Sequence, residues 1–240
     1  MRQTQGTTFV LVHGAWHGGW CWKKLTPLLR AAGHEVYTPT LSGLGERAHL
    51  LSPQIGLETH IADIAALLEY EDLHNVVLVG HSYGSMVITG VAEVAARRLT
   101  HLVFLDAFIP QDGQSLFDTI PDHGAAMQKI AAEAGDGWYV PLGNATFGVT
   151  DEADVAWMAT RITAQPLRTF TEPVRLTDPV ALALPRSYIL CRQDEPSLFD
   201  PFAEQAQAEG WGYDELQACH DAMITEPAAL AQILLKIVAD

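Results

Sequence analysis

A serine at the centre of a short glycine-flanked pattern is the clearest candidate for chemistry in this 240-residue chain. Ser82 lies in Gly80-His81-Ser82-Tyr83-Gly84, which matches the G-x-S-x-G pattern. The apolar strand pattern Val76–Val79 precedes it directly, and the helical pattern Ser85–Leu99 follows it. Small residues in such a strand–turn–helix setting let neighbouring backbones approach, and the serine oxygen is exposed at the positive end of the helix. The pattern predicts that Ser82 is a nucleophile.

A serine hydroxyl needs a base to take up its proton during attack, and one histidine is well placed for this. His220 follows the last predicted strand, Tyr213–Ala218, and precedes the last predicted helix, Pro227–Val238. A loop at this place can carry an imidazole to the carboxyl edge of the sheet. The other late histidine, His123, falls in a segment without a central strand. We predict that His220 is the base.

The acid that orients the imidazole is less certain from the residues alone. Asp194 follows the predicted strand Ser187–Cys191, and Asp106 follows the strand before it. Both stand at carboxyl ends of strands, where open α/β sheets bind their ligands. The sequence favours Asp194, with Asp106 as the alternative and Glu195 as a third choice.

The oxygen that becomes negative during attack needs fixed hydrogen-bond donors. One expected donor is the N–H of Tyr83, directly after the nucleophile, and the other is the N–H of Ala15, in the loop after the first strand. Trp16 and His17 continue this loop. They are expected either to line the substrate pocket or to pack beneath the segment that covers it.

Strand and helix patterns alternate along most of the chain, which predicts an α/β fold with a mostly parallel sheet flanked by helices. Continuous apolar runs are typical of strands buried on both faces. The predicted strands are Phe9–Val12, Glu35–Leu41, Val76–Val79, Leu102–Leu105, Ser187–Cys191 and Tyr213–Ala218. The predicted helices are Trp20–Ala32, Leu57–Tyr70, Ser85–Leu99, one that closes at Gln205–Glu209, and Pro227–Val238.

The segment 111–185 breaks this alternation, with several short helical patterns and no clear central strand. We expect it to be a helical cap inserted into a core made of residues 1–110 and 186–240; helices packed on that core are the alternative. The segment is rich in aromatic residues. The predicted pocket is lined by Trp16, His17, Asp106, Phe108, Trp138, Phe147 and Trp157.

Composition limits the classes of partner. The formal net charge of −15 disfavours binding to nucleic acid or to anionic membranes. No apolar stretch is long enough to span a bilayer, and the three cysteines show no disulfide or metal-binding spacing. We therefore expect a cytoplasmic protein that acts on a small molecule without a metal or another cofactor. The sequence leaves the oligomeric state open, a homodimer included.

Three stretches together resemble a known group of proteins. They are Leu11–Trp20, Gly80–Gly84 and the turn Cys219-His220-Asp221-Ala222-Met223. They resemble the plant methylesterase and hydroxynitrile lyase family of the α/β-hydrolase superfamily, and the related bacterial carboxylesterases, including pyrethroid hydrolases. The loop Thr40–Leu50 is similar to that of the bacterial enzymes. The resemblance extends from about Thr8 to the C-terminus and is poor in the segment 111–185.

The resemblance implies the α/β-hydrolase fold, a triad of Ser82, His220 and Asp194, oxyanion donors at Ala15 and Tyr83, and no cofactor. The lyases of this family carry Thr where this chain has Gly14 and Lys where it has Asp221. That lysine stabilises departing cyanide, so a carboxylate in its place opposes lyase chemistry.

Both departures favour a serine carboxylesterase that acts on a small apolar, aryl or methyl ester. The alternatives are a lyase or carbon–carbon bond hydrolase, and a ligand-binding protein of the same fold with slow turnover.

Overall fold

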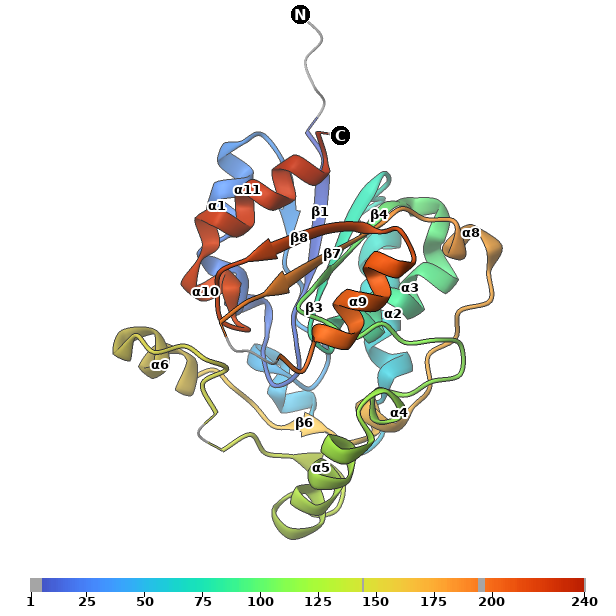
Figure 1. Ribbon diagram of the computed structural model, residues 1–240. Coiled ribbons are helices and arrows are strands. Elements are labelled where there is room, and N and C mark those ends of the chain that lie inside the picture. The colour runs from blue at the N-terminus through green and yellow to red at the C-terminus, as the bar shows by residue number, and fades with distance from the viewer. Residues whose placement is uncertain (1–5, 144, 194–196, 240) are drawn as a thin grey trace, which may run out of the picture.

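A six-stranded parallel sheet forms the centre of the protein in the computed structural model, which describes residues 6–143, 145–193 and 197–239. The strand order is β2-β1-β3-β4-β7-β8, and every neighbouring pair in it is parallel. The strands are β1 (Thr8–Val12), β2 (Glu35–Tyr37), β3 (Val76–His81), β4 (Leu99–Leu105), β7 (Arg186–Cys191) and β8 (Gly212–Leu216). Figure 1 shows helices on both sides of this sheet, as the sequence predicts.

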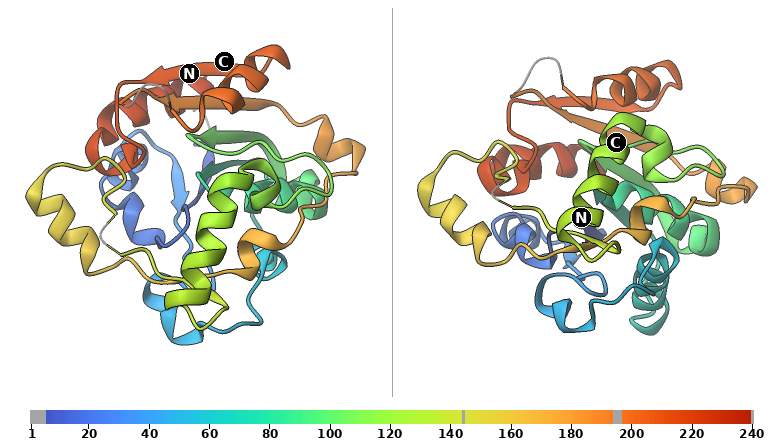
Figure 2. Two further views of the ribbon diagram at one scale, coloured as in Figure 1. Left: turned by 60° about the horizontal axis from the view of Figure 1, so that its bottom comes forward. Right: turned by 90° about the horizontal axis from the view of Figure 1, so that it is seen from below.

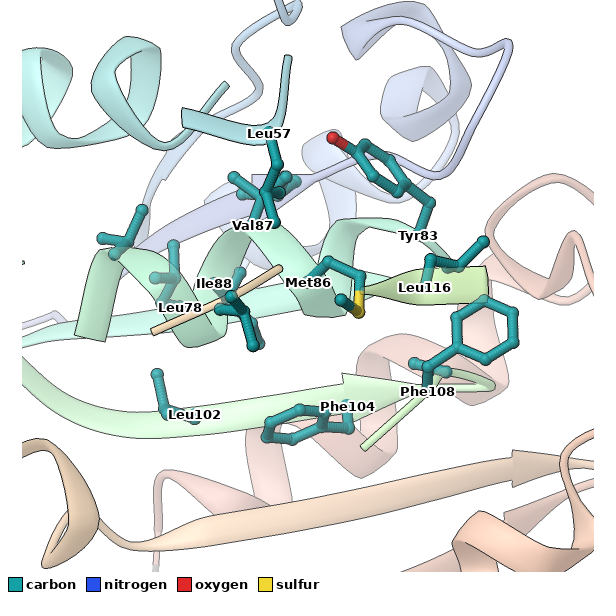
Figure 3. Packing of buried hydrophobic residues seen from close by; sticks show 14 of the residues in the cluster. Leu57, Leu78, Tyr83, Met86, Val87, Ile88, Leu102, Phe104, Phe108 and Leu116 are labelled. Carbon is teal, nitrogen blue, oxygen red and sulfur yellow. The ribbon is translucent and has the colours of Figure 1, made fainter. Parts of the chain in front are cut away.

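Each face of the sheet belongs to a separate apolar cluster, because side chains alternate between the two faces of a strand. Val10 and Leu78 point to the cluster that packs against α2 (Leu57–Tyr70), α3 (Gly84–Ala95) and α9 (Asp200–Ala208). Figure 3 shows Leu78, Leu102 and Phe104 in this cluster beside α3.

The second cluster lies on the opposite face, to which Phe9 and Val77 point. It packs against the 3₁₀ helix η1 (Gly19–Lys23) and three helices: α1 (Thr26–Ala31), α10 (Ala222–Thr225) and α11 (Pro227–Ile237). Burial on both faces accounts for the continuous apolar runs in the sequence.

Two predicted elements are shorter than expected. The helix predicted over Trp20–Ala32 is η1 followed by a separate α1, in whose first turn Pro27 stands. Proline has no N–H to donate and is suited to a helix start, so it begins a new helix there. The strand predicted over Glu35–Leu41 ends at Tyr37. Pro39 cannot donate to a neighbouring strand, which ends the ladder there.

The helix predicted over Ser85–Leu99 also differs at its end. α3 stops at Ala95, the 3₁₀ helix η3 covers Ala96–Arg98, and β4 starts at Leu99 rather than Leu102. The last strand runs Gly212–Leu216 rather than Tyr213–Ala218. The helix over Leu57–Tyr70 has the predicted bounds.

The segment 111–185 lies beside the sheet as a chain of short elements (Figures 1 and 2). Two strands of two residues each, β5 (Tyr139–Val140) and β6 (Gln165–Pro166), pair in an antiparallel β5–β6 ribbon in this segment. The sequence patterns do not predict this ribbon. Strands of two residues leave no periodicity to detect. The helices are α4 (Leu116–Thr119), α5 (Pro121–Ala134), α6 (Glu152–Ala159), α7 (Arg168–Thr171) and α8 (Pro179–Leu182).

Candidate active site

Ser82 stands in a strained turn between β3 and α3. Its φ is +53°, in the left-handed region that costs a non-glycine residue about 1–3 kcal/mol. Close backbone contacts explain the two glycines of the pattern. A Cβ on Gly80 would lie 2.8 Å from the carbonyl group of Gly84, and one on Gly84 would lie 2.7 Å from the carbonyl oxygen of Val12. The turn leaves Ser82 half-buried at the carboxyl edge of the sheet.

His220 lies against a buried aspartate. Its Nδ1 is 2.6 Å from Oδ2 of Asp106, whose other carboxylate oxygen accepts a 3.0 Å hydrogen bond from the N–H of Cys191. Asp106 is 3 % exposed and follows the end of β4 directly. Since a carboxylate accepts, Nδ1 of His220 carries the proton and Nε2 keeps its lone pair. A ring in this tautomer can act as a general base.

Asp106 is therefore the carboxylate that contacts the imidazole in the described part of the chain. Asp194 and Glu195, the other two candidates for the acid, lie outside the described residues. Both aspartates follow a strand in the sequence, and nothing local to either one indicates which of them reaches the imidazole.

Aromatic rings and a backbone contact hold the His220 ring in place. Phe199 stacks on it, with ring centroids 4.9 Å apart and an interplanar angle of 5°. Phe147 lies 6.0 Å away, centroid to centroid. Behind the turn, His81 Nε2 donates a 2.9 Å hydrogen bond to the carbonyl oxygen of His220. Burial holds the pKa of His81 well below its ordinary value, which favours a neutral ring.

The loop after β1 lies directly against the nucleophile. A Cβ on Gly14 would be 2.9 Å from His81 Nδ1 and 3.1 Å from Ser82 Cβ. His13 donates from Nδ1 to the carbonyl oxygen of Gly14 at 2.8 Å and accepts at Nε2 from the N–H of Leu41 at 3.1 Å. Burial lowers the pKa of His13 to about 3, so this ring is a neutral structural group that orients the peptide between Gly14 and Ala15.

Within the described residues, the N–H groups of Ala15 and Tyr83 donate no hydrogen bond to the protein. Both residues are buried, at 5 % and 1 % exposure. Buried N–H groups normally have partners, so two free donors beside a strained serine are suited to bind an external oxygen.

A second histidine–carboxylate pair lies beneath this loop. His17 Nδ1 is 2.7 Å from the carbonyl oxygen of Ala15, and its Nε2 is 3.0 Å from Oδ2 of Asp221. Both partners only accept, so both ring nitrogens carry a proton and His17 is a cation. Burial opposes this charge, but the Asp221 carboxylate outweighs it and raises the pKa of His17 above its ordinary value. The pair joins the first loop to the residue that follows His220.

The predicted pocket residues divide into two groups. Trp16 and Phe147 are close together, at 6.2 Å between centroids, and Phe147 also lies beside His220. Phe108 packs on Phe199, the ring that stacks on His220. These three aromatic residues surround the site, as does Asp106 through its bond to His220.

The ring contacts of Trp138 and Trp157 lie away from His220. Trp138 packs on Tyr139, and Trp157 packs on Trp20, with Arg161 over its ring. In the described residues no ring contact joins Trp138 or Trp157 to His220. His17 is 1 % exposed, its ring centroid lies 5.0 Å from that of Phe147, and it forms the buried pair with Asp221.

The structure also brings in residues that no local pattern indicated. His60, on α2, donates from Nε2 to the carbonyl oxygen of Ser42 at 2.9 Å, and its Nδ1 accepts from the Tyr83 hydroxyl at 2.8 Å. Burial lowers the pKa of His60 to about 4, in agreement with a neutral ring. Gln165, from β6, accepts from the N–H of Trp16 at 2.9 Å. In the sequence, the one indication of a role for His60 is that it stands among the apolar positions of the helix Leu57–Tyr70.

The fold and these contacts are those of a hydrolase. The chain matches the Alpha/beta hydrolase family over residues 9–233 and belongs to that family. This match confirms the fold class and the superfamily predicted from the three sequence stretches.

Individual relatives cover almost the whole chain. It is 41% identical to the "Carbendazim hydrolyzing esterase" of Nocardioides sp. (strain SG-4G), over 94% of this chain and 97% of that protein. It is 28% identical to "pFDCC methylesterase MES16" of Arabidopsis thaliana, over 96% and 94%. Among solved structures, an extracellular alpha/beta-hydrolase from a Paenibacillus species superposes with a TM-score of 0.83 at 26% identity, over 96% and 98%.

Proposed function

We propose that this protein is a serine carboxylesterase with a triad of Ser82, His220 and Asp106. The observation that carries the proposal is the 2.6 Å contact between His220 and the buried Asp106, beside a serine held at positive φ. Two relatives that align with almost the whole chain are named as esterases, which supports ester hydrolysis as the reaction.

The reaction follows the ordinary course for such a triad. Ser82 Oγ attacks the ester carbonyl carbon while His220 Nε2 takes its proton. The N–H groups of Ala15 and Tyr83 stabilise the oxyanion, and Asp106 stabilises the imidazolium. His220 then protonates the alkoxide that leaves, which forms an acyl-enzyme on Ser82. A water molecule then gives a proton to His220 and attacks the acyl carbonyl carbon. The bond from that carbon to Ser82 Oγ breaks, His220 returns the proton to Ser82 Oγ, and the acid is released.

Two features of the site support hydrolysis over cyanohydrin cleavage. Gly14 has no room for a Cβ, with His81 and Ser82 at 2.9 and 3.1 Å from where one would lie. The residue that follows the base His220 is Asp221, a carboxylate that is fully buried against His17. The position where the lyases carry a cationic side chain therefore carries none here. The segment 111–185 serves as the cap in this proposal, and Phe147 with Trp16 favours a small apolar, aryl or methyl ester.

We also propose a cytoplasmic setting for the protein. Cys21, Cys191 and Cys219 are buried and unpaired, which supports a reducing, cytoplasmic compartment. Across residues 6–143, 145–193 and 197–239, no helix combines the length and apolarity required to cross a bilayer.

The test is hydrolysis of p-nitrophenyl esters from acetate to octanoate by wild type and by Ser82→Ala, together with covalent labelling by a fluorophosphonate. We expect turnover and labelling in the wild type and neither in the variant. The chain length with the highest kcat/KM then measures the acyl pocket. A wild type that is neither labelled nor active on any ester would overturn the proposal.

A further inference from the structure

Trp16, the residue after the proposed oxyanion donor Ala15, has an unfavourable backbone conformation. Its φ is +64°, and a bulky residue in the left-handed region is a true outlier. Such strain persists only where the surrounding structure overrides it. The contacts that override it here all come from the segment 111–185, more than 120 positions further along the chain.

Three hydrogen bonds from that segment hold Trp16. Its N–H donates to Gln165 Oε1 at 2.9 Å, and its indole Nε1 donates to the carbonyl oxygen of Val140 at 2.8 Å. Its carbonyl oxygen accepts from the N–H of Thr163 at 3.0 Å. Val140 and Gln165 pair with each other in the β5–β6 ribbon, so one small unit makes two of these contacts.

Gln165 is the side chain that acts closest to the oxyanion hole. It is fully buried, and its Nε2 donates to Thr169 Oγ1 at 2.8 Å, so its amide has a fixed orientation with Oε1 towards Trp16. The peptide between Ala15 and Trp16 is then held at both ends, because the Ala15 carbonyl oxygen accepts from His17. The Gly14–Ala15 peptide, which carries the Ala15 N–H, is held by His13 at the Gly14 carbonyl oxygen. With the peptides on both sides of Ala15 held, the direction of its N–H is restricted.

We propose that Gln165 is a positioning residue for the oxyanion hole, through which the β5–β6 ribbon aligns the Ala15 N–H with the reacting carbonyl oxygen. The inference rests on the proposed esterase function. Within the described residues Gln165 makes no hydrogen bond to Ser82 or His220, and its effect passes through the backbone of Trp16. Its loss should therefore weaken the transition state more than the bound substrate.

The experiment compares Gln165→Met, which keeps the length of the side chain but loses the acceptor, with Gln165→Glu. Removing one oxyanion donor outright costs on the order of 10²–10³ in kcat, so a misaligned donor should cost roughly 10- to 100-fold. We expect this loss in kcat of Gln165→Met, with KM changed by less than about threefold. Affinity for a trifluoromethyl ketone, which forms a tetrahedral adduct on the serine, should fall by the same factor.

Gln165→Glu retains an oxygen that can accept from Trp16, and when protonated it can also donate to Thr169. Its activity should exceed that of Gln165→Met, and its activity relative to wild type should rise as the pH falls. Gln128→Met, on the exposed surface of α5, is the matched control and should leave kcat unchanged.

Two outcomes would overturn the inference. One is a folded Gln165→Met with wild-type kcat and wild-type affinity for the ketone. The other is a change of kcat and KM in Gln165→Glu without any loss of affinity for the ketone. This second outcome can be measured even if Gln165→Met does not fold. An inactive wild type, or an active Ser82→Ala, would instead refute the proposed function itself.

Discussion

His220 and Asp106 are 114 positions apart in the chain, yet Nδ1 of the histidine lies 2.6 Å from Oδ2 of the aspartate. The second oxygen of Asp106 is held by the N–H of Cys191 at the end of β7. The carboxylate of Asp106, at the end of β4, is therefore bound through one oxygen to β7 and through the other to His220. These two contacts keep it from rotating away from the imidazole.

Asp106→Asn should abolish most of the activity. An amide can present its NH₂ group to Nδ1, which favours the wrong tautomer of His220, so kcat should fall on the order of 10³–10⁴-fold. Asp194→Asn is the discriminating comparison and should cost far less. Steady-state kinetics on the best p-nitrophenyl ester decides between them, and a larger loss in Asp194→Asn would show that the acid is misassigned.

Gly14→Ala should impair catalysis although it adds a single methyl group. The new Cβ would lie 2.9 Å from His81 Nδ1 and 3.1 Å from Ser82 Cβ, so the loop or the nucleophile must move. A displacement near 1 Å can cost about 10²-fold, and we expect a loss of roughly 10- to 100-fold in the rate of fluorophosphonate labelling. A thermal melt checks that the variant folds. Labelling at the wild-type rate would mean that the site accommodates the methyl group freely.

Asp221→Asn should destabilise the protein in a pH-dependent way. The pKa of His17 is raised in the folded state, so the pair contributes fully below about pH 6.5, the ordinary value, and its contribution is lost as pH rises through the raised pKa. Breaking a buried pair typically costs about 3–5 kcal/mol.

Urea denaturation of wild type and Asp221→Asn across this range measures the difference in free energy of unfolding. The difference should be largest at the acidic end and should shrink towards alkaline pH. Glu204→Gln, at an exposed position on α9, should show no such trend. A gap that is constant with pH would indicate that His17 is uncharged.

His60 should make the protein sensitive to acid. Burial lowers its pKa to about 4, while the unfolded chain binds a proton near pH 6.5. Stability is therefore lost as pH falls between these values, by about 1.4 kcal/mol per pH unit. His60→Gln should reduce the fall in the free energy of unfolding between pH 6.5 and 4.5, as measured by urea denaturation. An equal slope in both proteins would contradict the neutral, buried ring.

Contiguous signals made much of the site predictable. The serine elbow is one run of five residues between an apolar strand and a helix, and its geometry is imposed by nearby backbone. The helix Leu57–Tyr70 has a strong periodicity and its predicted bounds hold. The predicted bounds are wrong next to proline, because apolar periodicity continues across Pro27 and Pro39 while backbone hydrogen bonding does not.

The amino-acid sequence by itself determined the fold class, the serine in its turn and a histidine after the last strand, since each depends on residues close together in the chain. Only the tertiary structure decided that Asp106 meets His220, that His17 is a cation paired with Asp221, and that Gln165 holds Trp16. These contacts join residues 114, 204 and 149 positions apart. Local propensity carries no information about them, because they arise when the sheet and the segment 111–185 pack and buried polar groups must find partners.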